Sequence, residues 1–417
     1  MFKRHTIQVF EHESLRIGQK GFEEEHWTAL IKLNELHDGK YFSVIHRGIK
    51  FSQYVGVIQV NKLALEVLPK IDKEEDTDWR EVLIAMMKVC KKLSPESHGA
   101  ANVKKQHLSL LELYFDLFLN EVNQLMRLGL IKQYRKETKN VKALKGKLEF
   151  SGHIKNNLIH KENFYTTHQV YDRDHSIHQI IAKALEVIQS ISNGSFLNDK
   201  CMRVQMNFPE VSNIKVTPTL FDNLQLNRKT EPYTKAIELA RLILLNYSPD
   251  IRGGKEKMLA LLFNMNTLWE EYVLRMLQKS SKSFEGMKIS GQAKKRFWET
   301  RTVRPDIVVE FRGITTIIDT KWKRITNNKA SIEDLRQMYV YNKYWGAKTS
   351  MLLYPKGKSS QSNISGSYYS DTTQEKDSEN SCLIGYLDSI KNGKLNSDWA
   401  DDFLQEVEKD LITTEIN

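Results

Sequence analysis

The fold is decided by Pro305-Asp306-Ile307-Val308-Val309-Glu310-Phe311-Arg312-Gly313-Ile314-Thr315-Thr316-Ile317-Ile318-Asp319-Thr320-Lys321-Trp322. Two apolar runs rich in β-branched residues flank Arg312-Gly313, and two residues are the length of a tight hairpin loop. We therefore expect two adjacent antiparallel strands, with Phe311 opposite Ile314 at the loop.

This hairpin register brings two carboxylates together. Counted outward from the loop, Asp306 lies opposite Asp319, at a position where Cβ atoms are about 5 Å apart. Two carboxylates at that distance repel each other unless a cation lies between them. Side chains alternate along a strand, so Asp319 and Lys321 share a face while Thr320 points away. Oxygen ligands of this kind suit Mg²⁺; the plainer alternative is a surface hairpin held by salt bridges.

The segments on either side of the hairpin predict an α/β unit. We expect one long helix from Lys257 to about Lys279, because apolar residues recur there at helical spacing. A second helix is expected from Ser331, which resembles an N-terminal cap, to about Trp345. Thr349–Tyr354 is typical of a further strand. The order is helix, strands, helix, strand.

We place the main domain boundary at residue 252, which gives domains of residues 1–252 and 253–417. Within the second, the Ser-, Gly-, Asn- and Thr-rich stretch 356–380 predicts a flexible surface loop. Residues 383–387 predict one more strand, and residues 388–417 carry no motif that we can place.

The first domain divides into a β-rich and a helical part. Short apolar runs broken by turn residues make residues 1–75 β-rich. Residues 76–252 are expected to be helical, with helices beginning near Asp78 and covering about 108–130 and 176–191.

The charge balance favours an anionic partner. The chain of 417 residues has 62 Lys and Arg against 52 Asp and Glu, a formal net charge of +10. A local concentration of Lys and Arg lies between residues 132 and 147. These residues are either a solvated charged face or a surface that contacts phosphates.

Several classes of protein are excluded. The three cysteines lie far apart and form no CxxC pair, so neither a zinc ribbon nor a disulfide framework is supported. No apolar run is long enough to span a membrane, and we expect a cytoplasmic chain. No GxxxxGK[ST] sequence occurs, so the chain is not expected to hydrolyse a nucleotide by itself.

Pro305-Asp306 followed by Asp319-Thr320-Lys321 resembles the PD-(D/E)XK nuclease motif. Further segments resemble the McrC family, the nuclease subunit of McrBC-type 5-methylcytosine-specific restriction systems, in that family's order. They are Leu65-Glu66-Val67-Leu68-Pro69-Lys70-Ile71, Leu144-Lys145-Gly146-Lys147-Leu148, Met265-Asn266-Thr267-Leu268-Trp269-Glu270, Gln337-Met338-Tyr339-Val340-Tyr341 and Leu352-Leu353-Tyr354-Pro355.

The resemblance implies a mixed α/β fold, in which a β-rich and helical N-terminal region precedes a restriction-endonuclease-like αβββαβ core. It implies that Asp306, Asp319 and Glu270 bind the catalytic metal and that Lys321 activates the attacking water and offsets charge on the phosphate. For Glu270 the alternative is a solvated helix acid.

Two further residues resemble the QxxxY element of RecB-like nucleases. Gln337 and Tyr341 are i,i+4 neighbours on one helical face. The resemblance implies that they support the active site or contact DNA; the alternative for Tyr341 is ordinary helix packing.

The family also implies the cofactors and partners. These are Mg²⁺, with Mn²⁺ able to substitute, double-stranded and modified DNA, and a McrB-like AAA+ GTPase hexamer that binds the GTP. The N-terminal region would contact this ring, with residues 132–147 as candidates for ring or DNA contact. Two alternatives stay open: a stand-alone RecB-like repair nuclease and a non-catalytic DNA-binding adaptor that activates an AAA+ partner.

Overall fold

The computed structural model describes residues 5–60, 63–71, 77–90, 92, 109–192, 196–224, 226–249, 257–325, 329–357, 362–370 and 374–416. The chain forms two compact units. Unit 1 contains Met1–His5, Ile58–Ala64 and Val103–Leu261, and unit 2 contains Thr6–Val57, Leu65–Asn102 and Leu262–Asn417. The exact boundary expected at residue 252 stays a prediction, since residues 250–256 are not among those described. A single boundary at residue 252 would not separate the two units, because most of the first hundred residues belong to unit 2 together with the C-terminal part.

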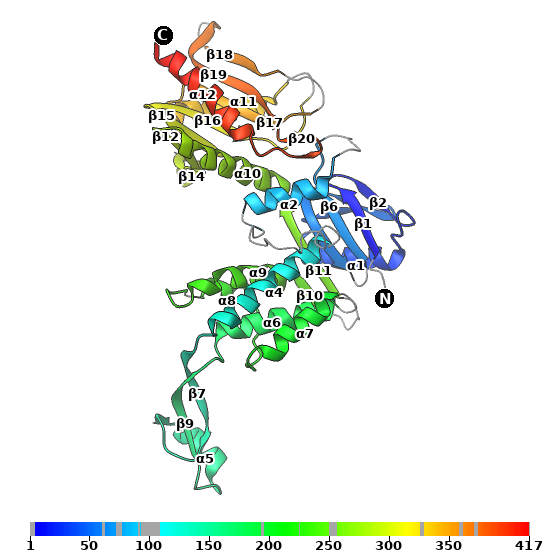
Figure 1. The fold of residues 1–417 in the computed structure, drawn as a ribbon, viewed down its shortest axis with the longest axis vertical. Coiled ribbons are helices and arrows are strands. Elements are labelled where there is room, and N and C mark those ends of the chain that lie inside the picture. The colour runs from blue at the N-terminus through cyan, green and yellow to red at the C-terminus, as the bar shows by residue number, and fades with distance from the viewer. Residues whose placement is uncertain are drawn as a thin grey trace. The chain divides into compact units, whose positions relative to one another are not determined.

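A six-stranded sheet forms the centre of unit 2. Its strand order is β12-β15-β16-β17-β19-β18, with antiparallel pairing except for the two parallel pairs β16–β17 and β17–β19. Together with α10 and α11 it gives the expected αβββαβ order (Figure 1). The strands are β12 Met287–Gly291, β15 Ile307–Phe311, β16 Ile314–Thr320, β17 Thr349–Pro355, β18 Ile364–Tyr369 and β19 Lys376–Leu387.

The expected hairpin register is confirmed. Phe311 pairs with Ile314, and the pairing continues in step to Ile307 with Ile318. Arg312 and Gly313 both have positive φ angles, 48° and 83°, which two-residue hairpin loops require to match the strand twist. The loop therefore fixes which residues of the two strands face each other.

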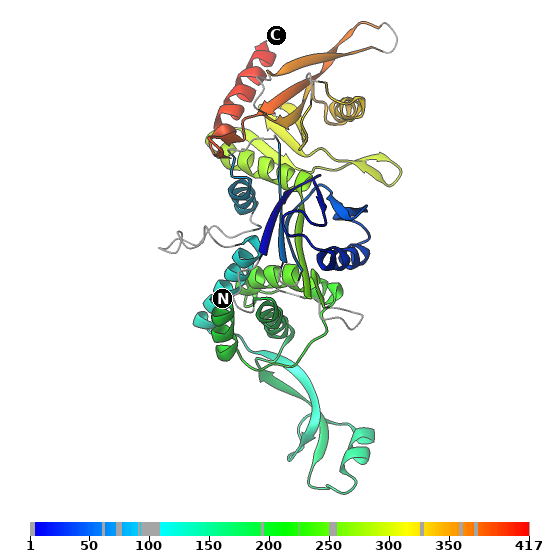
Figure 2. The ribbon, with the colours of Figure 1, turned by 90° about the vertical axis from the view of Figure 1, so that its right-hand side faces the viewer.

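Helices cover both faces of this sheet. α11 packs on β16, β17 and β19, and α10 packs on β12 and β16 and against α12 (Figure 2). Ser331 caps α11 as expected, accepting a hydrogen bond from the amide of Asp334. The helices of unit 2 are α1 Glu24–Leu36, α2 Trp79–Val89, α10 Met265–Ser280, η2 Ser281–Ser283, α11 Ile332–Trp345 and α12 Trp399–Ile416.

The helix expected over residues 257–279 was wrong in its first third. Residues 257–264 form strand β11, which lies between β5 and β10 in a five-stranded sheet of order β1-β6-β5-β11-β10. The apolar run Met258–Phe263 suits a strand with neighbours on both sides. Asn264 then starts α10 by accepting hydrogen bonds from the amides of Asn266 and Thr267. The strands are β1 His5–Phe10, β5 Tyr54–Val60, β6 Leu63–Leu68, β10 Tyr247–Pro249 and β11 Lys257–Asn264.

Two further expectations for unit 2 need correction. The β-rich part also contains α1, whose Leu30 and Leu33 are buried. The stretch 356–380 is not simply a loop, because β18 and the start of β19 pair there; residues 358–361 and 371–373 lie outside the described part. Short strands complete the unit: β2 Ser14–Arg16, β3 Phe42–Ile45, β4 Gly48–Phe51, β13 Lys295–Trp298, β14 Arg301–Val303, β20 Ile390–Lys391 and β21 Lys394–Leu395.

Unit 1 is a helical bundle that carries a long β-arm, so the expectation that residues 76–252 are helical was wrong for the strands between residues 133 and 172. α4, α6, α7 and α9 pack on one another, and the arm consists of β7, β8, β9 and α5 (Figure 1). Its elements are α4 Leu110–Leu128, β7 Gln133–Val141, β8 Lys147–Leu148, α5 Phe150–Asn157, β9 Phe164–Asp172, α6 Ser176–Ile191, α7 Phe196–Asn207, α8 Pro218–Asp222, η1 Glu231–Tyr233 and α9 Thr234–Leu245. In the described parts of both units, no helix combines the length and the apolar character needed to cross a membrane.

Candidate active site

The two aspartates of the motif lie at one end of the β15–β16 hairpin. Asp306 directly precedes β15, and Asp319 is the sixth residue of β16. By strand alternation Asp319 shares a face with Ile317, which belongs to the core cluster that contains Met338 and Tyr341 of α11. The carboxylates therefore lie where the α11 face of the sheet ends.

Asp306 is held by the residue after Asp319. Its Oδ2 accepts hydrogen bonds from the backbone amide of Thr320 at 2.8 Å and from the Thr320 hydroxyl at 3.1 Å. Burial, followed by the nearby charge of Glu270, raises the pKa of Asp306 to about 7. Strand alternation predicts that Thr320 points away from Asp319 and Lys321, and it gives no sign that the Thr320 hydroxyl reaches Asp306.

Asp319 is buried beside a lysine. Asp319 is only 2% exposed, and Nζ of Lys321 lies 2.7 Å from its Oδ2. Burial, followed by the charge of Asp306, raises the pKa of Asp319 to about 6, although Lys321 acts in the opposite direction. The expected shared face of Asp319 and Lys321 is confirmed.

Lys321 is surrounded by oxygen atoms. Besides Asp319, its Nζ lies 3.4 Å from Oδ1 of Asp334 and donates a 3.3 Å hydrogen bond to Oε1 of Gln337. Burial alone would lower the pKa of Lys321, but the neighbouring carboxylates raise it, Asp319 first. The ammonium group is therefore kept charged and pointed toward the carboxylates.

Glu270 reaches the same place from α10. Its Oε1 accepts a 2.6 Å hydrogen bond from Nε2 of Gln292, and the backbone amide of Gln292 donates to the carbonyl of Asp306 at 3.0 Å. Gln292 follows β12 and has a positive φ of 54°. It thus connects Glu270 to Asp306, and no sequence motif points to it.

Gln337 and Tyr341 form a hydrogen-bond relay behind Lys321. Nε2 of Gln337 donates to Oη of Tyr341 at 2.7 Å, and that hydroxyl donates to the carbonyl of Arg304 at 2.9 Å. The structure thus brings all six residues expected from the sequence into one connected group. Tyr341 is also 3% exposed, so its ring packs in the core while its hydroxyl contacts Gln337 and the Arg304 carbonyl.

Asp334 is a site residue that the motifs did not include. It lies one turn before Gln337 on α11, and its Oδ2 accepts a 2.6 Å hydrogen bond from Nζ of Lys323. Burial opposes its charge, but the hydrogen bonds from Lys323 and Ser331 hold the pKa of Asp334 below its usual range. It lies thirteen residues beyond Lys321, so only the packing of α11 on the sheet brings the two together.

The donor set fits a hard divalent cation. Glu270, Asp306 and Asp319 offer carboxylate oxygens from three different segments. The pKa values of the two aspartates are raised first by burial and then by a neighbouring carboxylate, and a bound cation would offset both effects. These three would hold Mg²⁺. This donor set contains no cysteine or histidine, which disfavours a soft transition metal.

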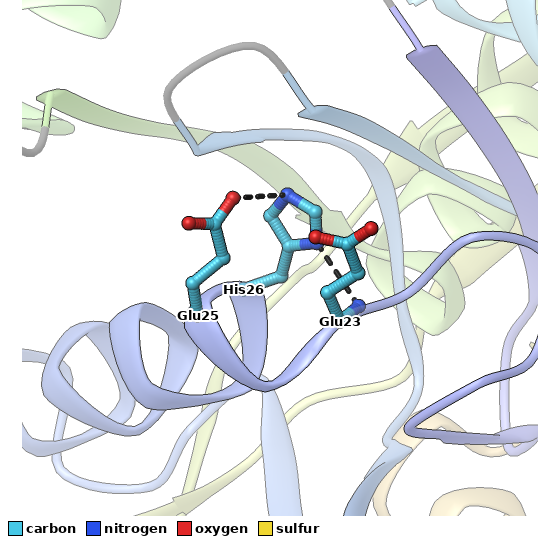
Figure 3. A group of neighbouring side chains, drawn as sticks. All are labelled: Glu23, Glu25 and His26. Atoms are coloured by element: carbon cyan, nitrogen blue, oxygen red, sulfur yellow. Dashed lines mark hydrogen bonds and ion pairs between the residues drawn. The ribbon is translucent and has the colours of Figure 1, made fainter.

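A tighter cluster elsewhere has a structural explanation. Among the described residues, ligand atoms within 4.8 Å of one another are found in Glu23, Glu25 and His26 at the start of α1 (Figure 3). The amide of Glu23 donates to Nδ1 of His26 at 3.1 Å, and Nε2 of His26 lies 3.6 Å from Glu25. These contacts are those of a capped helix terminus.

The first strand of the chain also touches the motif. Oε1 of Glu11 accepts a 2.7 Å hydrogen bond from Nε1 of Trp322 and a 3.1 Å bond from the amide of Lys70. The Trp322 ring lies against Trp269, the residue before Glu270, with centroids 5.1 Å apart. Trp322 therefore links the segment that carries Asp319 and Lys321 to the helix that carries Glu270.

Comparisons with known proteins identify the family. A model of the McrBC 5-methylcytosine restriction system component matches residues 49–355. The type IV methyl-directed restriction enzyme EcoKMcrBC of Escherichia coli (strain K12) is 23% identical over 272 residues, which cover 59% of this chain and 77% of that protein.

Two solved structures share the fold. A chain in a half-complex of Thermococcus gammatolerans McrB AAA+ hexamers with bound McrC matches with a TM-score of 0.69 and 19% identity, over 96% of this chain and 100% of that one. A chain of the Thermococcus gammatolerans McrBC complex matches with a TM-score of 0.50 and 21% identity, over 66% and 88%. The family model spans more than half of the sequence, and the expected resemblance is confirmed: this chain belongs to the McrBC 5-methylcytosine restriction system component family.

Proposed function

We propose that this chain is the Mg²⁺-dependent DNA endonuclease subunit of a modification-dependent restriction complex. The single observation that carries the proposal is the convergence of Asp306, Asp319, Lys321 and Glu270 at one end of a sheet. Repelling carboxylates buried beside a charged lysine reduce stability, so their presence together argues for a catalytic role.

The roles of the side chains follow from their contacts. Glu270, Asp306 and Asp319 would hold the cation, for which Mn²⁺ could substitute. A cation bound there would neutralise charge on the scissile phosphate and lower the pKa of a water molecule. Lys321, positioned by Asp319 and Gln337, orients that attacking water and offsets the negative charge that builds up on the phosphate.

The supporting residues keep this arrangement rigid. Gln337 holds Nζ of Lys321 and is itself held by Tyr341, whose hydroxyl is bonded to the backbone just before Pro305. Thr320 holds Asp306 from the neighbouring strand. A precise arrangement of charged groups needs such partners, because small displacements of reacting groups slow a reaction strongly.

The partner would be a McrB-like AAA+ GTPase hexamer. One similar structure is a complex of McrB AAA+ hexamers with bound McrC. The present chain has no GxxxxGK[ST] sequence of its own. We assign the contact to the arm of unit 1, where large apolar side chains are exposed; exposed apolar clusters mark protein interfaces. They are Leu144, Phe150, Ile154, Leu158 and Ile159.

The arm also contains the basic stretch 132–147. Part of its charge is neutralised locally, because Arg135 lies 2.9 Å from Asp172 and Lys139 lies 2.5 Å from Glu137. Contact of the remaining lysines with the ring or with DNA stays a prediction. In this proposal the ring hydrolyses GTP, this chain stimulates that hydrolysis, and the complex acts on modified double-stranded DNA in the cytoplasm.

A plasmid cleavage assay tests the proposal. Methylated and unmethylated DNA are incubated with Mg²⁺, with and without a McrB-like AAA+ protein from the same organism and GTP. We expect cleavage only with methylation, partner and GTP together. Lys321→Ala should abolish it, while Lys288→Ala, which removes an exposed lysine paired with Glu310 on the same sheet, should not.

The other outcomes are equally definite. Cleavage without partner or nucleotide would indicate a stand-alone nuclease of the RecB-like kind. Stimulated GTP hydrolysis without any cleavage, by wild-type chain and Lys321→Ala alike, would indicate a non-catalytic adaptor and contradict the proposal.

A further inference from the structure

A two-stranded ribbon beside the catalytic candidates is exposed over most of its length. β13 and β14 leave the six-stranded sheet between β12 and β15, and they turn between the paired residues Trp298 and Arg301. The ribbon projects from the sheet (Figure 2, in yellow), and all four residues of β13 are exposed. A ribbon of two strands is marginally stable when it packs on little else. Its surface is therefore available to a partner.

The ribbon carries unneutralised positive charge. Between residues 292 and 304 there is one acid, Glu299, against five cations: Lys294, Lys295, Arg296, Arg301 and Arg304. Lys295 is used internally, because its Nζ donates to the carbonyl of Tyr344 at 2.7 Å and lies over the ring of Trp345. In the described part of the chain, the other four make no ion pair with a carboxylate. Such a cluster is complementary to a polyanion.

Two aromatic side chains at the tip have different surroundings. Phe297 contacts Tyr344, with ring centroids 5.6 Å apart, and so anchors the ribbon to the end of α11. Trp298 is 63% exposed. An exposed tryptophan next to arginines is typical of surfaces that contact nucleic acid.

The residues at both ends of the ribbon are hydrogen-bonded to the candidate site residues. Gln292, at the start, bonds Glu270 through its side chain and Asp306 through its amide. Arg304, at the end, accepts a hydrogen bond from Tyr341 through its carbonyl. Whatever the ribbon binds is therefore held at a fixed distance from the carboxylates.

We propose that the β13–β14 ribbon binds the DNA duplex that is being cut. Lys294, Arg296, Arg301 and Arg304 contact phosphates, and Trp298 packs against the DNA at the tip. The major groove of B-DNA admits a two-stranded ribbon, and spaced Lys and Arg neutralise phosphates. This inference rests on the proposed nuclease function and adds the surface by which unit 2 holds its substrate.

Binding without Mg²⁺ tests the charges. The full chain is titrated against a fluorescent duplex about three helical turns long over a series of salt concentrations. Arg296→Gln/Arg301→Gln is compared with Lys282→Gln/Lys391→Gln, which removes the same charge from exposed positions elsewhere in unit 2. We expect only the ribbon variant to bind roughly tenfold more weakly, with a salt slope smaller by about 2.

This comparison is independent of catalysis because no metal is present. Equal affinities and slopes for the two double variants, or no binding by the wild-type chain, would overturn the ribbon proposal and leave the plasmid assay to decide the nuclease function. Binding lost by the ribbon variant while wild-type chain and partner cleave nothing would count against the nuclease function alone.

A second measurement identifies the partner directly. The photoreactive residue p-benzoylphenylalanine replaces Trp298 or, as the control, Tyr369, which is 62% exposed on β18 of the same unit. In the complex with the AAA+ protein and labelled duplex, we expect a cross-link to DNA from position 298 and none from position 369. A cross-link from position 298 to the AAA+ protein, or none to DNA, would overturn the proposal.

Discussion

Nε1 of Trp322 donates a 2.7 Å hydrogen bond to Oε1 of Glu11, a residue 311 positions earlier in the sequence. Glu11 directly follows β1, whereas Trp322 directly follows Lys321. The contact joins the residue after the first strand to the segment that carries Asp319 and Lys321 within unit 2. It makes Glu11 a positioning residue for the turn that carries Lys321.

Glu11 predicts a pH-dependent stability. Burial raises the pKa of Glu11 to about 7, against the hydrogen bonds from Trp322 and Lys70. A raised folded-state pKa contributes stability that is present below the unfolded value and is lost as the pH rises through about 7. Glu11→Gln keeps both acceptor contacts and removes the charge, so we expect it to be more stable than wild type by about 2 kcal/mol at pH 8 and equal near pH 4. Thermal unfolding at both pH values measures this, and equal melting temperatures at pH 8 would contradict it.

Asp306 predicts a conflict between stability and metal binding. The pKa of Asp306 is raised to about 7 by burial and then by Glu270, so its ionisation destabilises the metal-free protein as the pH rises through that value. At pH 8 without metal, we expect the free energy of unfolding of Asp306→Asn to exceed that of wild type by about 1–3 kcal/mol. Mg²⁺ should raise the melting temperature of wild type but not of the variant. A variant that Mg²⁺ stabilises as much as wild type would exclude Asp306 as a ligand.

The hydroxyl of Thr320 can be removed without changing the other hydrogen bond to Asp306. Thr320→Val keeps the shape and the amide hydrogen bond to Asp306 but removes the hydroxyl donor at 3.1 Å. Because that donor favours the ionised carboxylate, we expect cleavage to need a severalfold higher Mg²⁺ concentration for half-maximal rate. Thr320→Ser retains a hydroxyl and is the control. The interpretation fails if Val and Ser variants require the same Mg²⁺ concentration.

Tyr341 predicts a change of rate rather than of substrate binding. Tyr341→Phe removes the hydroxyl that accepts from Gln337 and donates to the Arg304 carbonyl, while the ring continues to fill the core. We expect a stability loss of about 1 kcal/mol and a roughly tenfold lower cleavage rate at saturating DNA. Single-turnover cleavage and DNA affinity measured in parallel separate the two effects. Weakened DNA binding with an unchanged rate would indicate that Tyr341 acts at the DNA instead.

The sequence predicted best where local rules fix geometry. A two-residue loop determines a hairpin register, so the opposition of the strands that carry Asp306 and Asp319 followed from counting. Capping residues likewise marked the starts of α2 and α11 at Asp78 and Ser331. The run after Lys257 was assigned to the wrong element because an apolar segment suits a buried strand as well as a helix, and only its neighbours in the sheet decide.

The partners of the catalytic group were mostly invisible in the sequence. Gln292, Asp334 and Glu11 come from other elements and meet the motif only through packing of the sheet, α11 and the first strand. The positive φ of Gln292 is likewise a property of the folded chain. Their contacts depend on tertiary structure, for which a single sequence carries no local signal.

The division of unit 2 along the chain determines when it can assemble during translation. Its first segments, residues 6–57 and 65–102, leave the ribosome before unit 1, and its last segment begins at Leu262. At about 5–20 residues per second, the ribosome needs on the order of ten seconds or more after Leu262 to finish the remaining third. Glu11 is made early and remains without its partner Trp322 well into that interval, and every catalytic candidate is in the part made last. A chain that ends before residue 270 therefore lacks all six of these candidates.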